Sequence, residues 1–475
     1  MNFHTSQFLF YFLPISLLLH RLSLGLTSTN VPARYPHSAR LTIFLLTLVF
    51  YGFENPWWLL PFLGSISFDY FWMSLLAKET RSIWRRRLCA ASIFQNLALF
   101  GIMKYGPAIS QTAKIVFPEL STYIPHLNFE APPGISFYIF ESLSIVIDVY
   151  RYRVAAPTNI LEFFSFMAMF PRFIAGPIVR YKSVARQFSE YGGMNIEAGL
   201  FLFTCGLFLK LVFADSFSVF TAYAFDLNGS PSILAAWIGT YSFTMQLYFD
   251  FSGYSLMAIG LGRCLGFQYP NNFNRPFLSK TLREFWRRWN ISLSAWLKTY
   301  LYIPLGGSWK GANRSYVNIW LTMLIGGIWH GAAVKFIVWG VWNGSFLVLE
   351  SFLRNRRNGK EFSSSGLTFL IIMIGFILFR ASTFSEAKSV FAALVDWRSL
   401  THFPLDGLLR NPVSFGLCVM GSVFCFVIER YINWPVLEQL QAIDFGSRVF
   451  AAYLLGTALV VGFSNHVIRF LYFQF

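Results

Sequence analysis

The strongest constraint on how this chain folds is a succession of long apolar stretches separated by short polar loops. Only 13% of the 475 residues are charged and 55% are hydrophobic, whereas soluble domains carry about 25% charged residues. Such stretches are typical of membrane-spanning helices, and the composition excludes a disordered chain. The basic residues that bring the net charge to +16 lie between apolar stretches, so nucleic acid is not an expected partner. The sequence therefore predicts an all-α, polytopic integral membrane protein.

Candidate membrane segments occur along the whole chain, and we expect about ten to thirteen of them to form membrane helices. The candidates are Phe8–Leu19, Leu41–Phe53, Trp57–Leu76, Leu88–Met103, Ile135–Tyr150, Leu161–Ile178, Gly199–Ala214, Ile233–Leu261, Val317–Ala333, Phe336–Phe352, Leu367–Phe379, Val413–Ile428 and Val449–Phe463. Several are shorter than the about 20 residues of a straight span, so tilted or re-entrant helices are expected. The first lacks the basic region and cleavage site of a signal peptide and is interpreted as a retained membrane segment.

Lysine and arginine are concentrated in alternate loops. Basic clusters lie at 21–40, 78–87, 172–186 and 354–360, and at Arg151 and Arg153, while the loops at 54–56 and 106–133 are poor in basic residues. Because basic loops remain in the cytoplasm, we expect an extracytoplasmic N-terminus.

The five cysteines are scattered, and no C-x-x-C motif occurs. This pattern argues against a disulfide framework or a zinc site. Buried cysteines that act as small apolar residues are the expected outcome.

The segment Ser279–Tyr300 differs from the apolar stretches. Leucine, phenylalanine and tryptophan recur there at helical spacing, and basic residues lie off this stripe. Thr281 and Glu284 have the spacing of a capping box. We interpret the segment as a helix in the membrane interface, and a simple anchor on anionic lipid is an equally good interpretation of the pattern.

One histidine, His330, sits deep in an apolar run. An ionisable group there is costly, which favours a functional role over a structural hydrogen bond to a neighbouring helix. Gly327 and Gly331 form one G-x-x-x-G motif and Gly340 and Gly344 another, and such motifs let helices approach closely. The other histidines are at segment ends or in loops and are interpreted as surface residues: His4, His20, His37, His126, His402 and His466.

Three further polar residues accompany apolar stretches. Asn290 lies at the edge of the apolar stripe, where its amide can donate to a carbonyl or orient an imidazole, although a plain interfacial residue fits as well. Asp148 is expected to pair with Arg151 one helical turn on. Asp250 has no basic neighbour in sequence and is expected to pair across helices or to orient another group.

Several catalytic motifs are missing from the sequence. It contains no G-x-x-x-x-G-K-[ST], no G-x-S-x-G and no H-E-x-x-H. Nucleotide-driven pumping, α/β-hydrolase chemistry and zinc hydrolysis are therefore without support.

The chain resembles the bacterial membrane-bound O-acyltransferases, in particular the alginate and exopolysaccharide O-acetyltransferase subgroup. The matching stretches are GISFYIFESLSIVIDVYR (134–151), FPRFIAGPIVR (170–180), YFDFSGYSLMAIGLGRCLGFQYPNNFNRPFLS (248–279), EFWRRWNISLSAWLKTYLYIPLGG (284–307), TMLIGGIWHGA (322–332), ILFRASTFSEA (377–387) and the closing FLYFQF. The block from Tyr248 to Ala332 is highly specific.

This resemblance implies a ring of tilted helices around a thin central catalytic region. It implies one domain over 1–475, with accessory helices at about 1–130, a catalytic core at about 134–353 and C-terminal helices at about 366–475. It makes His330 the catalytic base or acyl relay. It makes Asn290 the second polar residue of the site, and in the subgroup the residue at this position looks like histidine. Candidate donor- or substrate-binding residues are Arg283, Arg287, Arg288, Trp286, Trp329 and Asp250.

The implied reaction passes an acyl group, expected to be acetyl, from a cytoplasmic thioester to an extracytoplasmic polysaccharide hydroxyl, as in alginate biosynthesis. The donor is acetyl-CoA or an acyl carrier protein, used as a substrate, and neither a tightly bound cofactor nor a metal is expected. The expected location is the bacterial inner membrane, with phospholipid and a separate extracytoplasmic acetyltransferase as partners. The alternatives are a transporter or flippase in which His330 and Asp250 relay protons, and an export-complex subunit without acyl chemistry because of Asn290.

Overall fold

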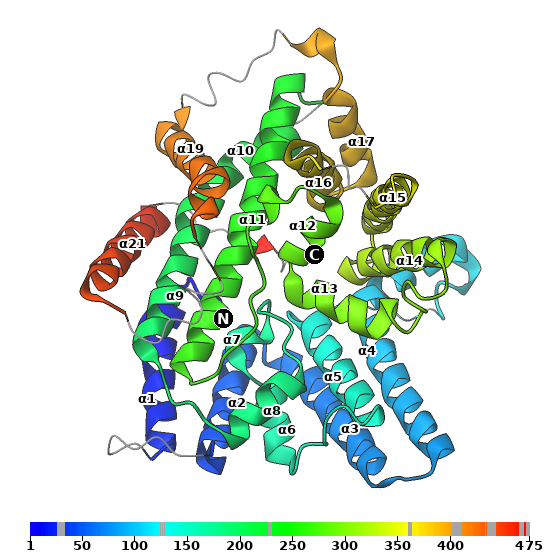
Figure 1. Ribbon diagram of the computed structural model, residues 1–475, viewed down its shortest axis with the longest axis vertical. Helices are drawn as coiled ribbons and strands as arrows, with labels where there is room; N and C mark the ends of the chain where they lie inside the picture. The colour runs from blue at the N-terminus through cyan, green and yellow to red at the C-terminus, as the bar shows by residue number, and fades with distance from the viewer. Residues whose placement is uncertain are drawn as a thin grey trace. The chain divides into compact units, whose positions relative to one another are not determined.

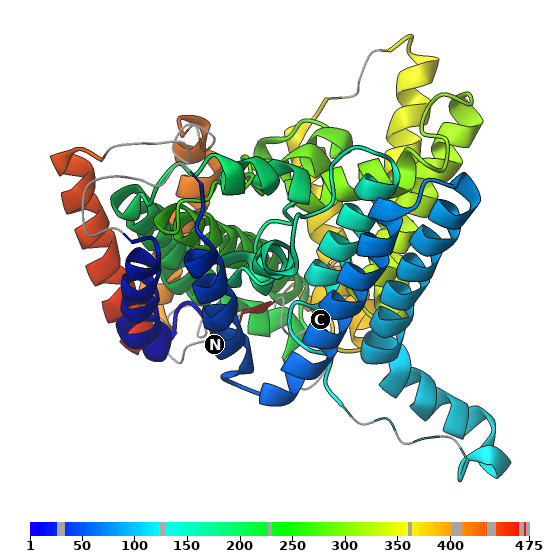
Figure 2. The ribbon, with the colours of Figure 1, turned by 90° about the horizontal axis from the view of Figure 1, so that it is seen from below.

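The computed structural model describes residues 1–25, 34–123, 125, 127, 129–226, 230–359, 363–400, 410–432, 434, 443–464 and 470–471, and every regular element in this part is a helix (Figures 1 and 2). Two compact units are present: 1–203 with 257–270, and 204–256 with 271–475. We call them the first and second unit. Each unit contains residues from two of the three sections that the resemblance implies, namely about 1–130, 134–353 and 366–475.

The first unit contains π-helix η1 (Gln7–Phe12), α1 (Leu13–Ser23), α2 (His37–Gly52), η2 (Pro56–Trp58), α3 (Leu59–Lys78), α4 (Ser82–Val116), η3 (Pro118–Leu120), α5 (Ile135–Tyr150), α6 (Ile160–Met167), α7 (Phe170–Phe173) and α8 (Tyr181–Ser189). The second contains η4 (Leu209–Ala214), α10 (Asp215–Phe225), η5 (Pro276–Leu278), α12 (Leu282–Arg288), α13 (Ile291–Leu297), η6 (Lys298–Tyr302), α14 (Ala312–His330), α15 (Val334–Arg356), α16 (Ser365–Arg380), α17 (Phe384–Ala393), η7 (Trp397–Ser399), α19 (Pro412–Phe426), η8 (Ile428–Arg430) and α21 (Phe445–Ser464). Helices α9 (Ile196–Phe208) and α11 (Ile233–Cys264) contribute residues to both units.

The fold is that of a multi-pass membrane protein, as predicted. Six helices in the described part of the chain are long and apolar enough to cross a membrane: Pro56–Lys78, Ser82–Val116, Ile196–Phe225, Val334–Arg356, Pro412–Arg430 and Phe445–Gly462. This is fewer than the ten to thirteen expected, because several apolar stretches fold into shorter or interrupted helices. The stretch 161–178, for example, divides into α6 and α7. Interrupted backbone is tolerated at membrane depth only where protein buries it, and α7 is buried throughout.

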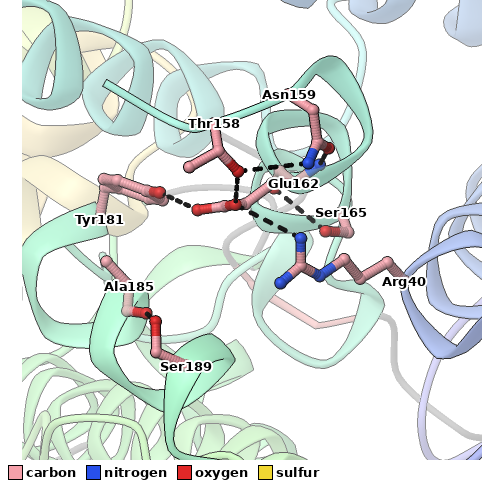
Figure 3. A network of polar contacts seen from close by, with 8 residues as sticks. All are labelled: Arg40, Thr158, Asn159, Glu162, Ser165, Tyr181, Ala185 and Ser189. Atoms are coloured by element: carbon pink, nitrogen blue, oxygen red, sulfur yellow. Dashed lines mark hydrogen bonds and ion pairs between the residues drawn. The ribbon is translucent and has the colours of Figure 1, made fainter. Parts of the chain in front are cut away.

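Polar networks hold the short helices of the first unit in place. Glu162 on α6 accepts hydrogen bonds from Thr158 (2.7 Å), from Arg40 on α2 (3.3 Å) and from the Tyr181 hydroxyl on α8 (Figure 3). Asn159 caps α6, because its side chain accepts the backbone N–H of Glu162. One carboxylate thus ties three helices together.

Several sequence expectations are wrong in the first unit. Asp148 pairs with Arg153 (3.6 Å) and not with Arg151, because α5 ends at Tyr150 and Tyr152 takes a positive φ that turns the chain back. His20 is buried rather than exposed, and its Nε2 contacts the Leu265 carbonyl (3.2 Å).

Two arginines assigned to basic loops are also buried. Arg172 pairs with Glu141, and Arg85 donates to the carbonyls of Leu76 and Val149. His4 is buried as well, whereas His37 is exposed as expected. His126, His402 and His466 lie outside the described residues.

In the second unit, α14 and α15 pack along one another (Figure 1). A Cβ atom on Gly340 would lie 2.7 Å from the Met323 carbonyl oxygen and 2.9 Å from Cα of Leu324, and one on Gly327 would meet the Phe336 carbonyl. The backbones therefore touch where the G-x-x-x-G motifs predict close approach. All five cysteines are free thiols and four are buried, which agrees with their predicted role.

Candidate functional site

The predicted interfacial helix at Ser279–Tyr300 is interrupted. Helix α12 ends at Arg288, and α13 begins at Ile291. Between them Asn290 takes φ 42° and ψ 58°, a left-handed conformation that asparagine adopts more readily than most residues. Thr281 caps α12 as its spacing predicts, because its side chain accepts the N–H of Glu284. Glu284 in turn accepts the N–H of Lys280, one residue before the N-cap.

Aromatic packing fixes this interruption. Trp289 is buried and lies against the rings of Phe273, Phe277, Phe285 and Phe376. The buried indole anchors the short link between the helices, so the left-handed residue next to it is held in place.

His330 is the last residue of α14 and is buried in a cage of aromatic rings. Its ring centroid lies 4.8 Å from those of Trp329 and Phe379 and 5.2 Å from that of Trp339. The contacts are close to perpendicular at Phe379 and Trp339. Packing of this kind holds the imidazole in one orientation, as a reacting group requires.

A cavity of about 660 Å³ connects the break to the imidazole. Asn290 and His330 both line it, together with Trp286, Arg283 and Arg287. Its helical lining residues come from α11, α12, α13, η6, α14, α15 and α16. Helix α15 lies against α12, α14 and α16 (Figure 1). The α14 wall of the cavity is one helical face, formed by Ala312, Ser315, Tyr316, Ile319, Thr322, Met323, Gly326 and His330.

The two ends of the cavity differ in chemistry. Trp339 contacts His330 at one end, and Ser351 accepts a hydrogen bond from Arg283 (3.1 Å) at the other. Both residues lie on α15, where their positions are about 18 Å apart along the axis. Among the described residues, the cations of the lining are Arg283, Arg287, Lys298 and Arg354, and none of its residues carries a carboxylate. A long ligand with an anionic end fits this distribution of charge.

The basic end is held by contacts from α15. The Glu350 carboxylate accepts the backbone N–H groups of Leu282 (2.6 Å) and Arg283 (3.4 Å). It therefore satisfies N–H groups that the start of a helix leaves unpaired. Arg283 is fixed at both its backbone and its side chain.

Two residues of the cavity lining each bury a polar atom that has no hydrogen-bond partner among the described residues. The atoms are Oδ1 of Asn290, an acceptor, and Nε1 of Trp286, a donor. Burying unpaired polar groups is unfavourable, so they are candidates for contact with a ligand that offers both a donor and an acceptor.

The remaining sequence candidates do not line this cavity. Arg288 pairs with Glu284 (2.6 Å) on its own helix, and Trp329 packs beside His330. Asp250 forms a buried ion pair with Lys210 (2.8 Å) and accepts the backbone N–H of Leu471 (2.9 Å).

Sequence reasoning missed Lys210, which also pairs with Asp215 (2.6 Å). The available signal was a lysine inside the apolar run Gly199–Ala214. It also missed Asn272, a buried loop residue that contacts the start of α13, because a short asparagine-rich loop has the pattern of an ordinary turn.

Comparison with known proteins identifies the family of the chain. The sequence model of the membrane-bound O-acyltransferase family matches residues 151–390, which include the whole break and His330. A probable alginate O-acetylase of Azotobacter vinelandii is 38% identical, with both chains covered in full. Its counterpart in Pseudomonas aeruginosa is 38% identical over 92% of this chain and 83% of its own.

A peptidoglycan O-acetyltransferase of Helicobacter pylori is 31% identical over 100% of this chain and 97% of its own. These relatives are transferases, so a transporter or a subunit without chemistry is not favoured. The chain belongs to the membrane-bound O-acyltransferase family and is a multi-pass membrane acyltransferase.

Proposed function

We propose that the protein passes an acetyl group from a cytoplasmic thioester across the membrane towards a hydroxyl of an extracytoplasmic polysaccharide, the final acceptor. The observation that carries this proposal is one cavity with a cationic end, two unpaired buried polar atoms and a caged imidazole. The names of the alginate and peptidoglycan O-acetyltransferases support acetyl as the group and polysaccharide as the acceptor class.

The donor proposed is a phosphopantetheine thioester, as part of acetyl-CoA or of an acyl carrier protein. Such an arm has a phosphate at one end, a thioester at the other and amide groups between them. Arg283 and Arg287 are placed to bind the phosphate. An amide offers both a donor and an acceptor, which complements Oδ1 of Asn290 and Nε1 of Trp286.

In the reaction, His330 takes the proton of the acceptor hydroxyl as its oxygen attacks the thioester carbonyl carbon. The tetrahedral intermediate collapses, the carbon–sulfur bond breaks, and the thiolate takes the proton from His330. Asn290 orients the donor, and the aromatic cage excludes water from the imidazole. An acyl-histidine relay is the alternative route, and trapping of acetylated His330 by mass spectrometry would replace the base mechanism with it.

The proposed setting is the bacterial inner membrane, with the basic loops and the cationic end of the cavity in the cytoplasm and the N-terminus outside. Phospholipid surrounds the protein. A separate extracytoplasmic acetyltransferase is proposed to receive the acetyl group and deliver it to the polymer.

The function is tested by incubating purified protein with radiolabelled acetyl-CoA and with an acetylated carrier protein, and by measuring thiol release and transfer of the label. We expect thiol release from at least one donor. If both donors remain intact, with and without a soluble sugar acceptor, the proposal is wrong.

The cationic end gives a separate prediction. Replacing both arginines (Arg283→Gln with Arg287→Gln) removes two partly exposed phosphate contacts of about 0.5–1 kcal/mol each. The KM for acetyl-CoA should rise about tenfold, with kcat within about twofold. Lys280→Gln is the matched control, since Lys280 is an exposed cation just before α12 and does not line the cavity. An equal rise of KM in this control would contradict the assignment.

A further inference from the structure

Asn290 occupies the N-cap position of α13 but does not cap it. Asparagine at this position ordinarily accepts a backbone N–H of the first helical turn with its own side chain. Here no such bond forms, and Oδ1 of Asn290 has no partner among the described residues. Something else must therefore satisfy the start of α13.

That role is taken by Asn272, which belongs to the loop before η5 and is fully buried. Its Oδ1 accepts the backbone N–H (3.1 Å) and the hydroxyl (2.8 Å) of Ser292, the second residue of α13. Its carbonyl accepts the N–H of Ile291 (3.0 Å). One residue, distant in sequence, satisfies both of the first two N–H groups of the helix.

The loop is also fixed on the other side of the break. The N–H of Asn274 donates to the carbonyl of Arg288 (2.9 Å), and Arg288 donates to the carbonyl of Arg275 (3.5 Å). The loop 272–275 therefore spans the link between α12 and α13. It braces the left-handed residue from both ends.

We propose that Asn272 is a positioning residue: by capping α13 in place of Asn290, it leaves the amide of Asn290 free to face the cavity and contact the donor. The inference rests on the proposed function only for the role of Asn290 in transfer. Without Asn272, the N–H of Ser292 loses this acceptor, and the side chain of Asn290, at the N-cap position, is expected to take its place.

This exchange predicts a specific non-additivity. Asn272→Ala should lower kcat for thiol release from acetyl-CoA to the level of Asn290→Gly, about a hundredfold below wild type. The double variant should be no slower than Asn290→Gly alone, because the amide has already left the cavity. Asn272→Asp retains the acceptor oxygen and should keep a kcat near that of wild type.

Asn271→Ala is the matched control. Asn271 lies in the same loop, but its side chain accepts the N–H of Phe273 within that loop. Its effect should be small and should simply add to that of Asn290→Gly. If losses from Asn272→Ala and Asn290→Gly multiply in folded protein, Asn272 has only a structural role and the proposal is wrong.

A cryo-EM map of full-length Asn272→Ala separates this inference from the proposed function. We expect Oδ1 of Asn290 within hydrogen-bond distance of the N–H of Ser292. An amide that stays on the cavity wall would overturn the inference. If wild-type protein releases no thiol, the proposed function fails, and the map alone decides the role of Asn272. If Asn272→Ala does not fold, Ser292→Ala is the variant to use. It removes the hydroxyl, one of the two donors to Oδ1 of Asn272, and is expected to leave Asn290 in place and kcat unchanged. A hundredfold loss of kcat in Ser292→Ala would overturn the inference.

Discussion

His330→Ala should abolish acyl transfer while the protein remains folded. His330 ends α14 inside a cage formed by Trp329, Trp339 and Phe379, and the cavity lining formed by the described residues contains neither another imidazole nor a carboxylate. We therefore assign removal of the hydroxyl proton to His330. We expect kcat to fall by about a thousandfold.

Loss of the ring also leaves a void, which should cost about 1–3 kcal/mol of stability. His330→Gln fills more of this space and should be equally inactive with a smaller decrease in Tm. His37→Ala removes an exposed imidazole and serves as the control for both variants. Thiol release, size-exclusion profile and Tm are measured together. A folded His330→Ala variant with wild-type turnover would remove His330 from the mechanism.

The second large effect is expected at Asn290, where backbone and side chain must be tested separately. Because φ is 42°, Asn290→Ala combines loss of the amide with backbone strain of about 1–2 kcal/mol. Asn290→Gly removes the amide without that strain, since glycine adopts this conformation freely. We expect Asn290→Gly to keep the wild-type Tm and to lose about a hundredfold in kcat.

The subgroup resemblance makes Asn290→His informative. Histidine also tolerates a left-handed conformation better than most residues, so this variant should fold. We expect it to be no more active than wild type, because Asn290 already lines the cavity and is proposed to orient the donor. Activity that appears only in Asn290→His would instead mean that the native chain is an inactive subunit. Unchanged kcat in Asn290→Gly would make Asn290 a purely structural residue.

The membrane class, the all-α fold and the importance of His330 could be predicted because each has a local signal. Apolar stretches reflect the cost of exposing backbone and charge to lipid, and a lone histidine inside such a stretch is conspicuous. Close packing of α14 and α15 was likewise encoded locally, in the glycines at 327 and 340.

The break before Asn290 could not be predicted, because the apolar repeat continues at helical spacing from Phe285 through Leu293. The break depends on Asn272 and on the aromatic contacts of Trp289, which only the tertiary structure brings together. The same limit applies to Arg287 and Arg288: neighbouring residues point about 100° apart on a helix, and the sequence does not say which direction faces the cavity.

The most direct test of the whole account is a cryo-EM map of the full-length protein with a hydrolysis-resistant acetyl-CoA analogue, in which a methylene group separates the acetyl carbonyl from sulfur. We predict the phosphates beside Arg283 and Arg287, the arm along the face of α14, and the acetyl carbonyl beside His330. An analogue bound outside this cavity, or bound with its acetyl group away from His330, would contradict the account.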